Sequence, residues 1–122
     1  MNIRVMNRYD IQGAKFDCPH IVISITDDAE FFPDIPEKNC QGILQIAVWD
    51  TEDGKNFRSI HNFGASDIPT DKIFNTHHAQ EILEFVFKHL PKIELIVCQC
   101  DVGLSRSAAT AAALSKILNH TS

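Results

Sequence analysis

One short segment of the sequence, CDVGLSRS from Cys100 to Ser107, carries a thiol and a guanidinium six positions apart. A deprotonated cysteine is a strong nucleophile, and the planar fork of an arginine can hold two oxygens of a phosphate at once. Gly103 lies between them, and glycine lets a loop turn its backbone amides inward toward an anion. The segment therefore predicts a site in which Cys100 attacks an anion that Arg106 holds.

The position of this segment between two predicted elements favours the same chemistry. The apolar run at 93–97 predicts a strand before it, and the alanine-rich stretch from Ser105 or Ser107 to 118 predicts a helix after it. A helix start presents unpaired N–H groups and partial positive charge, which stabilise an anion and lower a thiol pKa from its free value of about 8.5. An arginine is unfavourable at that position by itself, so Arg106 is expected to have an anion nearby.

The rest of the chain must form a sheet that holds this loop. Strands alternate with helices, which predicts an α/β fold: a three-layer sandwich with a mostly parallel central sheet and the phosphate-binding loop between a central strand and a helix. Ligands bind such sheets at the carboxyl ends of the strands. The other predicted elements are strands at 2–6 (an edge strand), 21–25 and 43–49, a long polar segment at 51–71, and a helix at 76–90 that Thr76 caps and Pro91 ends.

These residues resemble a known family. Cys100 to Ser107 matches the C-x5-R-[ST] phosphate-binding loop of cysteine-dependent protein tyrosine phosphatases, and the small dual-specificity branch is most similar. The low-molecular-weight phosphatases carry the same motif near the N-terminus, so they fit badly. The order of the predicted strands and helix is also similar, so the resemblance covers roughly the whole chain, although only the loop is specific.

The resemblance implies a role for each residue of the motif. Cys100 would form a cysteinyl-phosphate, Arg106 would bind the phosphoryl oxygens, and Ser107 would assist breakdown of the intermediate through its hydroxyl. The substrate would be a phosphorylated protein or a small phosphomonoester, and no metal or other cofactor is implied. The phosphate-binding residues would be Asp101, Val102, Gly103, Leu104, Ser105 and Arg106.

In the family, an aspartic acid on a separate loop protonates the leaving oxygen and then activates water. Asp50 is the first candidate, because it follows the predicted strand in VWD as the acid of the family follows a strand. Asp67 is the main rival, because its separation from Cys100 is more typical. Asp53 and Asp71 are weaker candidates, and exposed loop aspartates are most often simple turn residues.

The sequence departs from the family pattern at three points. Gln99 stands where the family usually has a histidine that orders the loop, which makes a weak enzyme or a catalytically inactive binding protein conceivable. Asp101 adds an acid to the loop, which disfavours highly anionic phosphoinositides as substrates. The chain also ends soon after the predicted loop helix, so we expect a single phosphatase-like domain over 1–122 that lacks the further C-terminal helices of the family.

The other cysteines leave further alternatives open. Cys98 is expected in the core, and Cys18 or Cys40 could pair with Cys100 under oxidation. Zinc bound by Cys98 and Cys100 with His77 and His78 is disfavoured, because the spacing is C-x-C and no second cysteine pair exists. Three functions follow: a protein phosphotyrosine or dual-specificity phosphatase, a phosphate-binding pseudophosphatase, and an arsenate reductase or sulfurtransferase that uses the same loop.

The composition and net charge of the chain limit the partners and the location that these functions can have. The chain has 122 residues, 44% of them hydrophobic, and a net charge of −5 without a basic cluster, so nucleic acid and membrane are not expected as partners. Its apolar runs are short and its first residues contain no signal-peptide core, which predicts a cytoplasmic protein. The sequence leaves the oligomeric state open.

Overall fold

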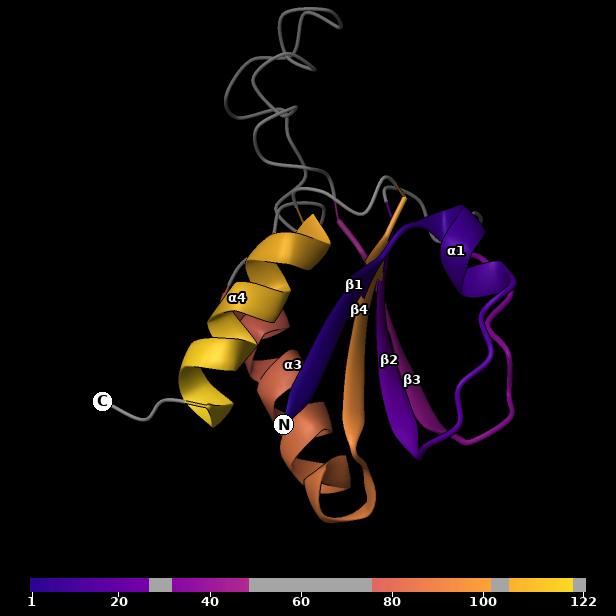
Figure 1. The fold of residues 1–122 in the computed structure, drawn as a ribbon. Helices are drawn as coiled ribbons and strands as arrows, with labels where there is room; N and C mark the ends of the chain where they lie inside the picture. The colour runs from indigo at the N-terminus through magenta and orange to yellow at the C-terminus, as the bar shows by residue number, and fades with distance from the viewer. Residues whose placement is uncertain (27–31, 49–75, 102–105, 120–122) are drawn as a thin grey trace, which may run out of the picture.

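The computed structural model describes residues 1–26, 32–48, 76–101 and 106–119, and Figure 1 shows their arrangement. Within these residues the chain forms one sheet of four parallel strands in the order β1-β4-β2-β3. The predicted α/β class with a parallel central sheet is therefore confirmed. The elements in chain order are β1 (Asn2–Met6), α1 (Arg8–Gln12), β2 (His20–Thr26), β3 (Cys40–Ala47), α3 (Thr76–His89), the 3-10 helix η4 (Leu90–Lys92), β4 (Leu95–Cys100) and α4 (Arg106–Leu118).

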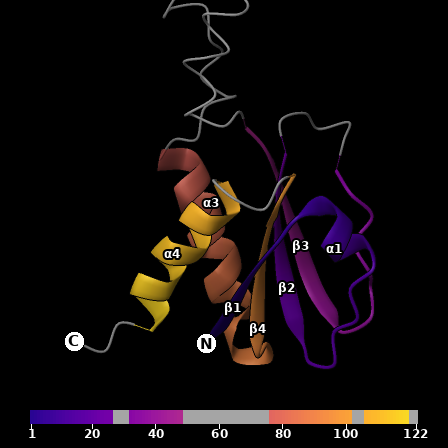
Figure 2. The same cartoon turned by 45° about the horizontal axis from the view of Figure 1, so that its top comes forward.

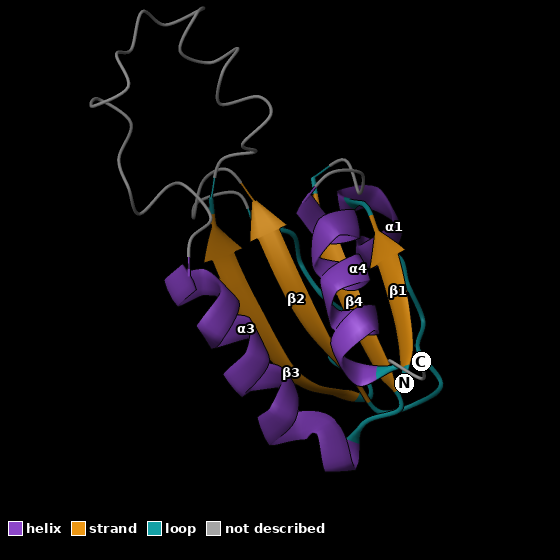
Figure 3. Cartoon of the chain, turned by 90° about the vertical axis from the view of Figure 1, so that its left-hand side faces the viewer, coloured by secondary structure: helices purple, strands orange, loops and turns teal. Residues whose placement is uncertain are grey.

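The sheet has a layer on each face. Helices α3 and α4 pack on one face, with α4 over β1 and β4 and α3 over β2 and β3 (Figure 3). Helix α1 and the segments at 13–19 and 32–39 lie on the opposite face (Figure 1). No helix among the described residues is long and apolar enough to cross a membrane.

Two apolar clusters hold these layers together, because successive residues of a strand point to opposite faces. On the α3/α4 face, Ile21, Ile23 and Ile25 of β2 pack with residues of both helices. On the α1 face, Val22 packs with Ile11 of α1. Full burial of each such side chain contributes about 1.5–3 kcal/mol relative to exposure, so both faces of the sheet anchor the strands.

Strand β4 lies between β1 and β2, and all of its residues are buried. A central parallel strand is covered on both faces, which explains its nearly continuous apolar sequence. The strand was expected at 93–97 but runs to Cys100, because Cys98 and Cys100 pair with Ile23 and Ile25 of β2. The predicted nucleophile is thus the last residue of the strand, paired with β2 on one side.

Strand β3 also differs from its predicted bounds of 43–49. It begins at Cys40, and the part of the prediction that falls on Trp49 lies outside the described residues. Gly42 lies in this strand, and the end of α3 packs close to it. A Cβ at this position would lie 2.9 Å from Nε2 of His89, so glycine permits the close packing of the helix on the strand.

The helices agree with the prediction to within a few residues. Helix α3 includes Thr76 as its first residue, although Thr76 was expected as the cap, and Pro91 lies in the 3-10 helix that follows. Helix α4 begins at Arg106. Helix α1 was not predicted because five residues are too short for a clear helical period; Oδ1 of Asn7 caps it by accepting from the backbone N–H of Asp10 at 2.8 Å.

The topology places a switch point at the carboxyl end of β4. After β1 the chain turns to α1 on one face, whereas after β4 it continues to α4 on the other face. Neighbouring strands whose connections leave to opposite faces form a topological switch point, where open α/β sheets bind ligands. Figure 2 shows that α4 starts near this end of β4.

Candidate active site

Cys100 and Ser107 are in direct contact at this switch point. The Sγ of Cys100 lies 3.0 Å from the Oγ of Ser107, in a hydrogen bond that either group can donate. The thiol sits at the end of β4 and the hydroxyl in the first turn of α4, so the end of the strand meets the start of the helix through these two side chains. Cys100 is only 1% exposed and Ser107 is fully buried. The sequence prediction that these two residues share one site is consistent with this geometry.

Arg106 begins α4 and reaches across the carboxyl edge of the sheet. Its Nη1 donates to the backbone oxygen of Val48, just after β3, at 2.8 Å. Its Nη2 lies 3.9 Å from Oδ2 of Asp101, and its side chain is 12% exposed. The expectation that Arg106 has an anion nearby is met in this structure by Asp101, which belongs to the predicted loop itself.

Asp101 is held from two further directions. Nη2 of Arg8 lies 2.8 Å from Oδ1 of Asp101 and Nε of Arg8 lies 3.3 Å from the same oxygen. The hydroxyl of Thr26 donates to the carboxylate, 3.1 Å from Oδ2 and 3.3 Å from Oδ1. Asp101 follows β4, Arg8 follows β1 and Thr26 ends β2, so three adjacent strands bring these groups to one edge of the sheet.

The sequence reasoning missed Arg8 and Thr26. Each lies at the carboxyl end of a predicted strand, which is the edge where the loop was expected, so their position could have signalled a role. The missing information was the strand order, since only the pairing of β4 with both β1 and β2 places the two residues beside Asp101.

Gln99 lies on the opposite face of the sheet from Cys100. It is fully buried, and its Oε1 accepts a hydrogen bond from the hydroxyl of Ser24 on β2. Its Nε2 has no hydrogen-bond partner among the residues that the structure describes. The hydrogen bond that Gln99 makes is therefore to a side chain inside the sheet.

The other predicted site residues cannot be placed in this geometry. The four loop residues between Asp101 and Arg106, which are Val102, Gly103, Leu104 and Ser105, lie outside the described residues. The same holds for Asp50 and for its rivals Asp53, Asp67 and Asp71. The choice of the general acid therefore stays a prediction.

Cys98 shares a face of β4 with Cys100 and is fully buried in the α3/α4 core, as expected. Burial raises the pKa of the Cys98 thiol to about 12, and the nearby Cys100 adds to this rise. A protonated, buried thiol of this kind is chemically inert.

Cys18 and Cys40 lie away from Cys100. Both pack against the cluster on the α1 face, whereas Cys100 belongs to the cluster on the α3/α4 face. Cys40 also begins β3 and pairs with His20, at the amino end of a parallel sheet whose carboxyl end carries Cys100. None of the four cysteines, all of which lie in the described residues, forms a disulfide. The sheet thus separates Cys18 and Cys40 from the predicted nucleophile.

Histidines 77 and 78 lie in the first turn of α3, where Nε2 of His77 is 3.2 Å from Oε1 of Glu81. Within the described residues no group of three or more histidine, cysteine and acidic side chains is arranged to hold a metal ion.

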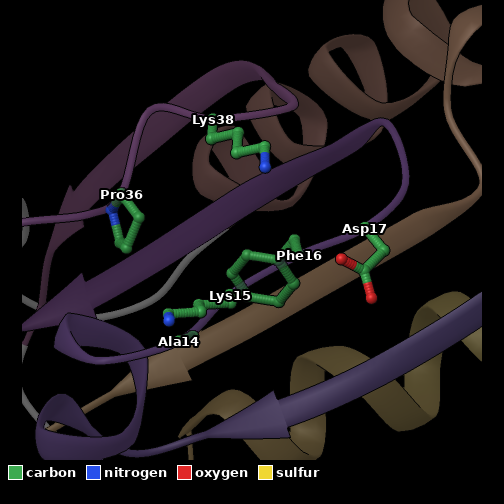
Figure 4. Close-up of a pocket in the computed structure, with 6 residues that line it drawn as sticks. All are labelled: Ala14, Lys15, Phe16, Asp17, Pro36 and Lys38. Atoms are coloured by element: carbon green, nitrogen blue, oxygen red, sulfur yellow. The ribbon is translucent and has the colours of Figure 1, made fainter.

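A pocket of about 300 Å³ lies on the α1 face (Figure 4). Phe16 belongs to the apolar cluster of that face, so the sheet stands between this pocket and Cys100. The pocket is therefore not part of the candidate active site. Its lining residues are Ala14, Lys15, Phe16, Asp17, Pro36 and Lys38.

Comparisons with known proteins add no relative to this description: no family model, no curated protein and no solved structure matches the chain.

Proposed function

We propose that this chain is a phosphomonoester hydrolase that works through a cysteinyl-phosphate intermediate, with phosphotyrosine in proteins as its main substrate class. A dual-specificity enzyme would also accept phosphoserine and phosphothreonine. The observation that carries the proposal is the 3.0 Å contact between the thiol of Cys100 and the hydroxyl of Ser107, with Arg106 at the start of the same helix. The sequence motif requires these three residues to act at one place.

The first step of the proposed reaction is attack of the Cys100 thiolate on phosphorus. A sulfur–phosphorus bond forms as the bond from phosphorus to the leaving oxygen breaks, and that oxygen takes a proton from an aspartic acid, for which Asp50 is our first candidate. Arg106 would hold two of the phosphoryl oxygens, whose charge it stabilises through a planar pair of N–H groups. Cys100 is nearly fully buried, so the phosphoryl group must enter at the carboxyl end of β4.

The second step returns the thiol. Water attacks phosphorus as the sulfur–phosphorus bond breaks, and inorganic phosphate leaves. The departing sulfur becomes negatively charged, and a hydroxyl at 3.0 Å can donate a hydrogen bond to it. Ser107 is therefore assigned to this step, and the aspartate, now deprotonated, accepts a proton from the water.

A second candidate function is phosphate binding without turnover. The specific observation in its favour is that Arg106 already donates to the backbone oxygen of Val48 and faces the carboxylate of Asp101. These contacts hold the guanidinium in place, so an oxyanion that binds Arg106 meets a fixed geometry, which favours binding over the alignment that attack by Cys100 requires.

The absence of disulfides among the described residues supports a reducing compartment for this chain. A cysteine nucleophile must stay reduced, and none of the four cysteines, all of which the structure describes, forms a disulfide. We therefore place the protein in the cytoplasm as part of the same proposal.

Turnover of p-nitrophenyl phosphate and of a phosphotyrosine peptide separates these two functions. Cys100→Ser should abolish hydrolysis and keep phosphate binding, and the wild-type chain should yield a phosphocysteine that is trapped by rapid denaturation. Cys18→Ser is the matched control, because it removes a thiol on the other face of the sheet and should leave turnover unchanged. Hydrolysis that survives Cys100→Ser would refute the proposed enzyme, and tight phosphate binding without turnover in the wild-type chain would favour the binding protein.

A further inference from the structure

Among the described residues, Asp101 is the acidic side chain that lies beside Arg106. Its carboxylate lies closer to Arg8 than to Arg106. Nη2 of Arg8 approaches it to 2.8 Å, whereas Nη2 of Arg106 stays at 3.9 Å. A charge-assisted hydrogen bond is formed at the first distance and not at the second. The acid in the loop is therefore bound mainly to Arg8 and not to the arginine of the motif.

Several contacts keep the carboxylate in this position. Arg8 uses both Nε and Nη2 on Oδ1, and the Thr26 hydroxyl donates to the carboxylate from β2. The backbone N–H of Arg8 also points at the backbone oxygen of Asp101, 3.5 Å away. Asp101 is thus tied to the ends of β1 and β2, on the side of the switch point away from α4.

We propose that Arg8 is a positioning residue that holds the carboxylate of Asp101 away from Arg106, so that Arg106 can accept a tetrahedral oxyanion. The proposal rests on the proposed function only in assigning an oxyanion to Arg106. Arg8 acts through Asp101 and is not itself assigned to the phosphoryl group.

The charge balance gives the physical reason. Among the described residues, these two arginines and one carboxylate carry a net charge of +1 at this edge of the sheet, which attracts an oxyanion. Without Arg8 the net charge of these groups falls to zero, and the carboxylate keeps the Thr26 hydroxyl but loses the cation that draws it away from Arg106. Asp101 and Arg8 are about a quarter exposed, so solvent weakens these effects without removing them.

Titration calorimetry with sodium tungstate, a tetrahedral oxyanion, tests this role by binding alone. At about 0.05 M ionic strength, Arg8→Met should weaken tungstate binding on the order of tenfold, the size of one charge-assisted hydrogen bond. The double variant Arg8→Met/Asp101→Asn should return to within about threefold of wild type, because asparagine does not neutralise Arg106. Arg8→Lys should also bind within about threefold of wild type, because it keeps the charge beside Asp101.

Arg4→Met is the matched control. It removes an arginine from β1 and changes the net charge equally, but its guanidinium lies 5.9 Å from the centre of the Phe16 ring, on the α1 face. Its tungstate affinity should stay within about twofold of wild type.

Two results would overturn the proposal: unchanged binding by Arg8→Met, or a double variant that binds as weakly as Arg8→Met. A wild-type chain that binds no tungstate would overturn it as well. Asp101→Asn also removes the carboxylate that Arg8→Met leaves without its cation, which by itself stabilises the fold. Both variants are therefore titrated at a temperature at which circular dichroism shows them fully folded, so that a difference in affinity reports on the site. A wild-type chain that binds tungstate but hydrolyses no phosphomonoester refutes the proposed hydrolase, while the order of affinities still decides the role of Arg8.

Discussion

The thiol of Cys100 and the hydroxyl of Ser107 lie 3.0 Å apart at the point where the last residue of β4 meets the first turn of α4. The contact is buried, so water does not compete for it. It joins the predicted nucleophile to the group that would support its departure from phosphorus.

Ser107→Ala should slow the breakdown of the phosphocysteine more than its formation. The departing sulfur loses its hydrogen-bond donor, so kcat should fall by about 100-fold while the burst of the first turnover is kept. Rapid-quench measurements with p-nitrophenyl phosphate check this, and the covalent intermediate should accumulate. Ser115→Ala, an exposed change on the same helix, is the control. A kcat loss without accumulated intermediate would assign Ser107 to another step.

Arg106→Lys should behave as a severe change although the charge is kept. Lysine cannot hold two phosphoryl oxygens in a plane, and it cannot reproduce the contacts to Val48 and Asp101 together. We expect kcat to fall and KM to rise, with kcat/KM reduced by at least about 100-fold. Steady-state kinetics measure this, with Arg4→Lys as the control. Near-normal kinetics would show that this helix start is not the active site.

Ser24 and Gln99 should contribute to stability as a pair. Ser24→Ala leaves the Gln99 side chain buried without its hydrogen bond, and Gln99→Leu leaves the Ser24 hydroxyl in the same state. Each single change should lower the free energy of unfolding by about 1–3 kcal/mol. The double variant should lose less than the sum of the two, by on the order of 1 kcal/mol. Denaturant unfolding provides the four values, and simple additivity would contradict the pairing.

Stability should fall in alkaline solution because of Cys98. Burial raises the pKa of the folded thiol from its ordinary value of 9.0 to about 12. Below pH 9 the thiol is protonated in both states and its full contribution to stability is present. Above pH 9 the unfolded thiol ionises first, so the free energy of unfolding should decrease by about 1.4 kcal/mol per pH unit until the folded pKa is reached.

Urea unfolding between pH 8 and roughly 10.5, a range set by these two pKa values, isolates this effect. Cys98→Ala should give a flatter dependence on pH than wild type, whatever its cost at neutral pH. Ser115→Ala, an exposed change that leaves every thiol in place, should keep the wild-type slope. Parallel curves for wild type and Cys98→Ala would mean that Cys98 ionises equally in the folded and unfolded chain.

The sequence by itself determined the features that depend on near neighbours. Apolar runs indicated where the strands of the sheet lie, because a buried parallel strand is apolar along its whole length. The apolar run before Cys100 and the alanine-rich stretch after it predicted a strand end followed by a helix start. The connection between them is short, so the thiol of Cys100 and the hydroxyl of Ser107 were expected at one site, and they lie in contact. The buried position of Cys98 also followed from its place on the central strand.

Only the tertiary structure decided which distant groups meet at that site. Arg8 and Asp101 are 93 positions apart, and Ser24 and Gln99 are 75 apart. Parallel strands are joined by crossovers, so chain order does not indicate which strands are neighbours. The order β1-β4-β2-β3 is known only from the tertiary structure. The face of the sheet to which Gln99 points depends on the strand register, since a shift of one residue reverses every side chain. The physical reason is that local sequence sets the conformation of each strand, whereas packing of the whole chain sets which strands lie together.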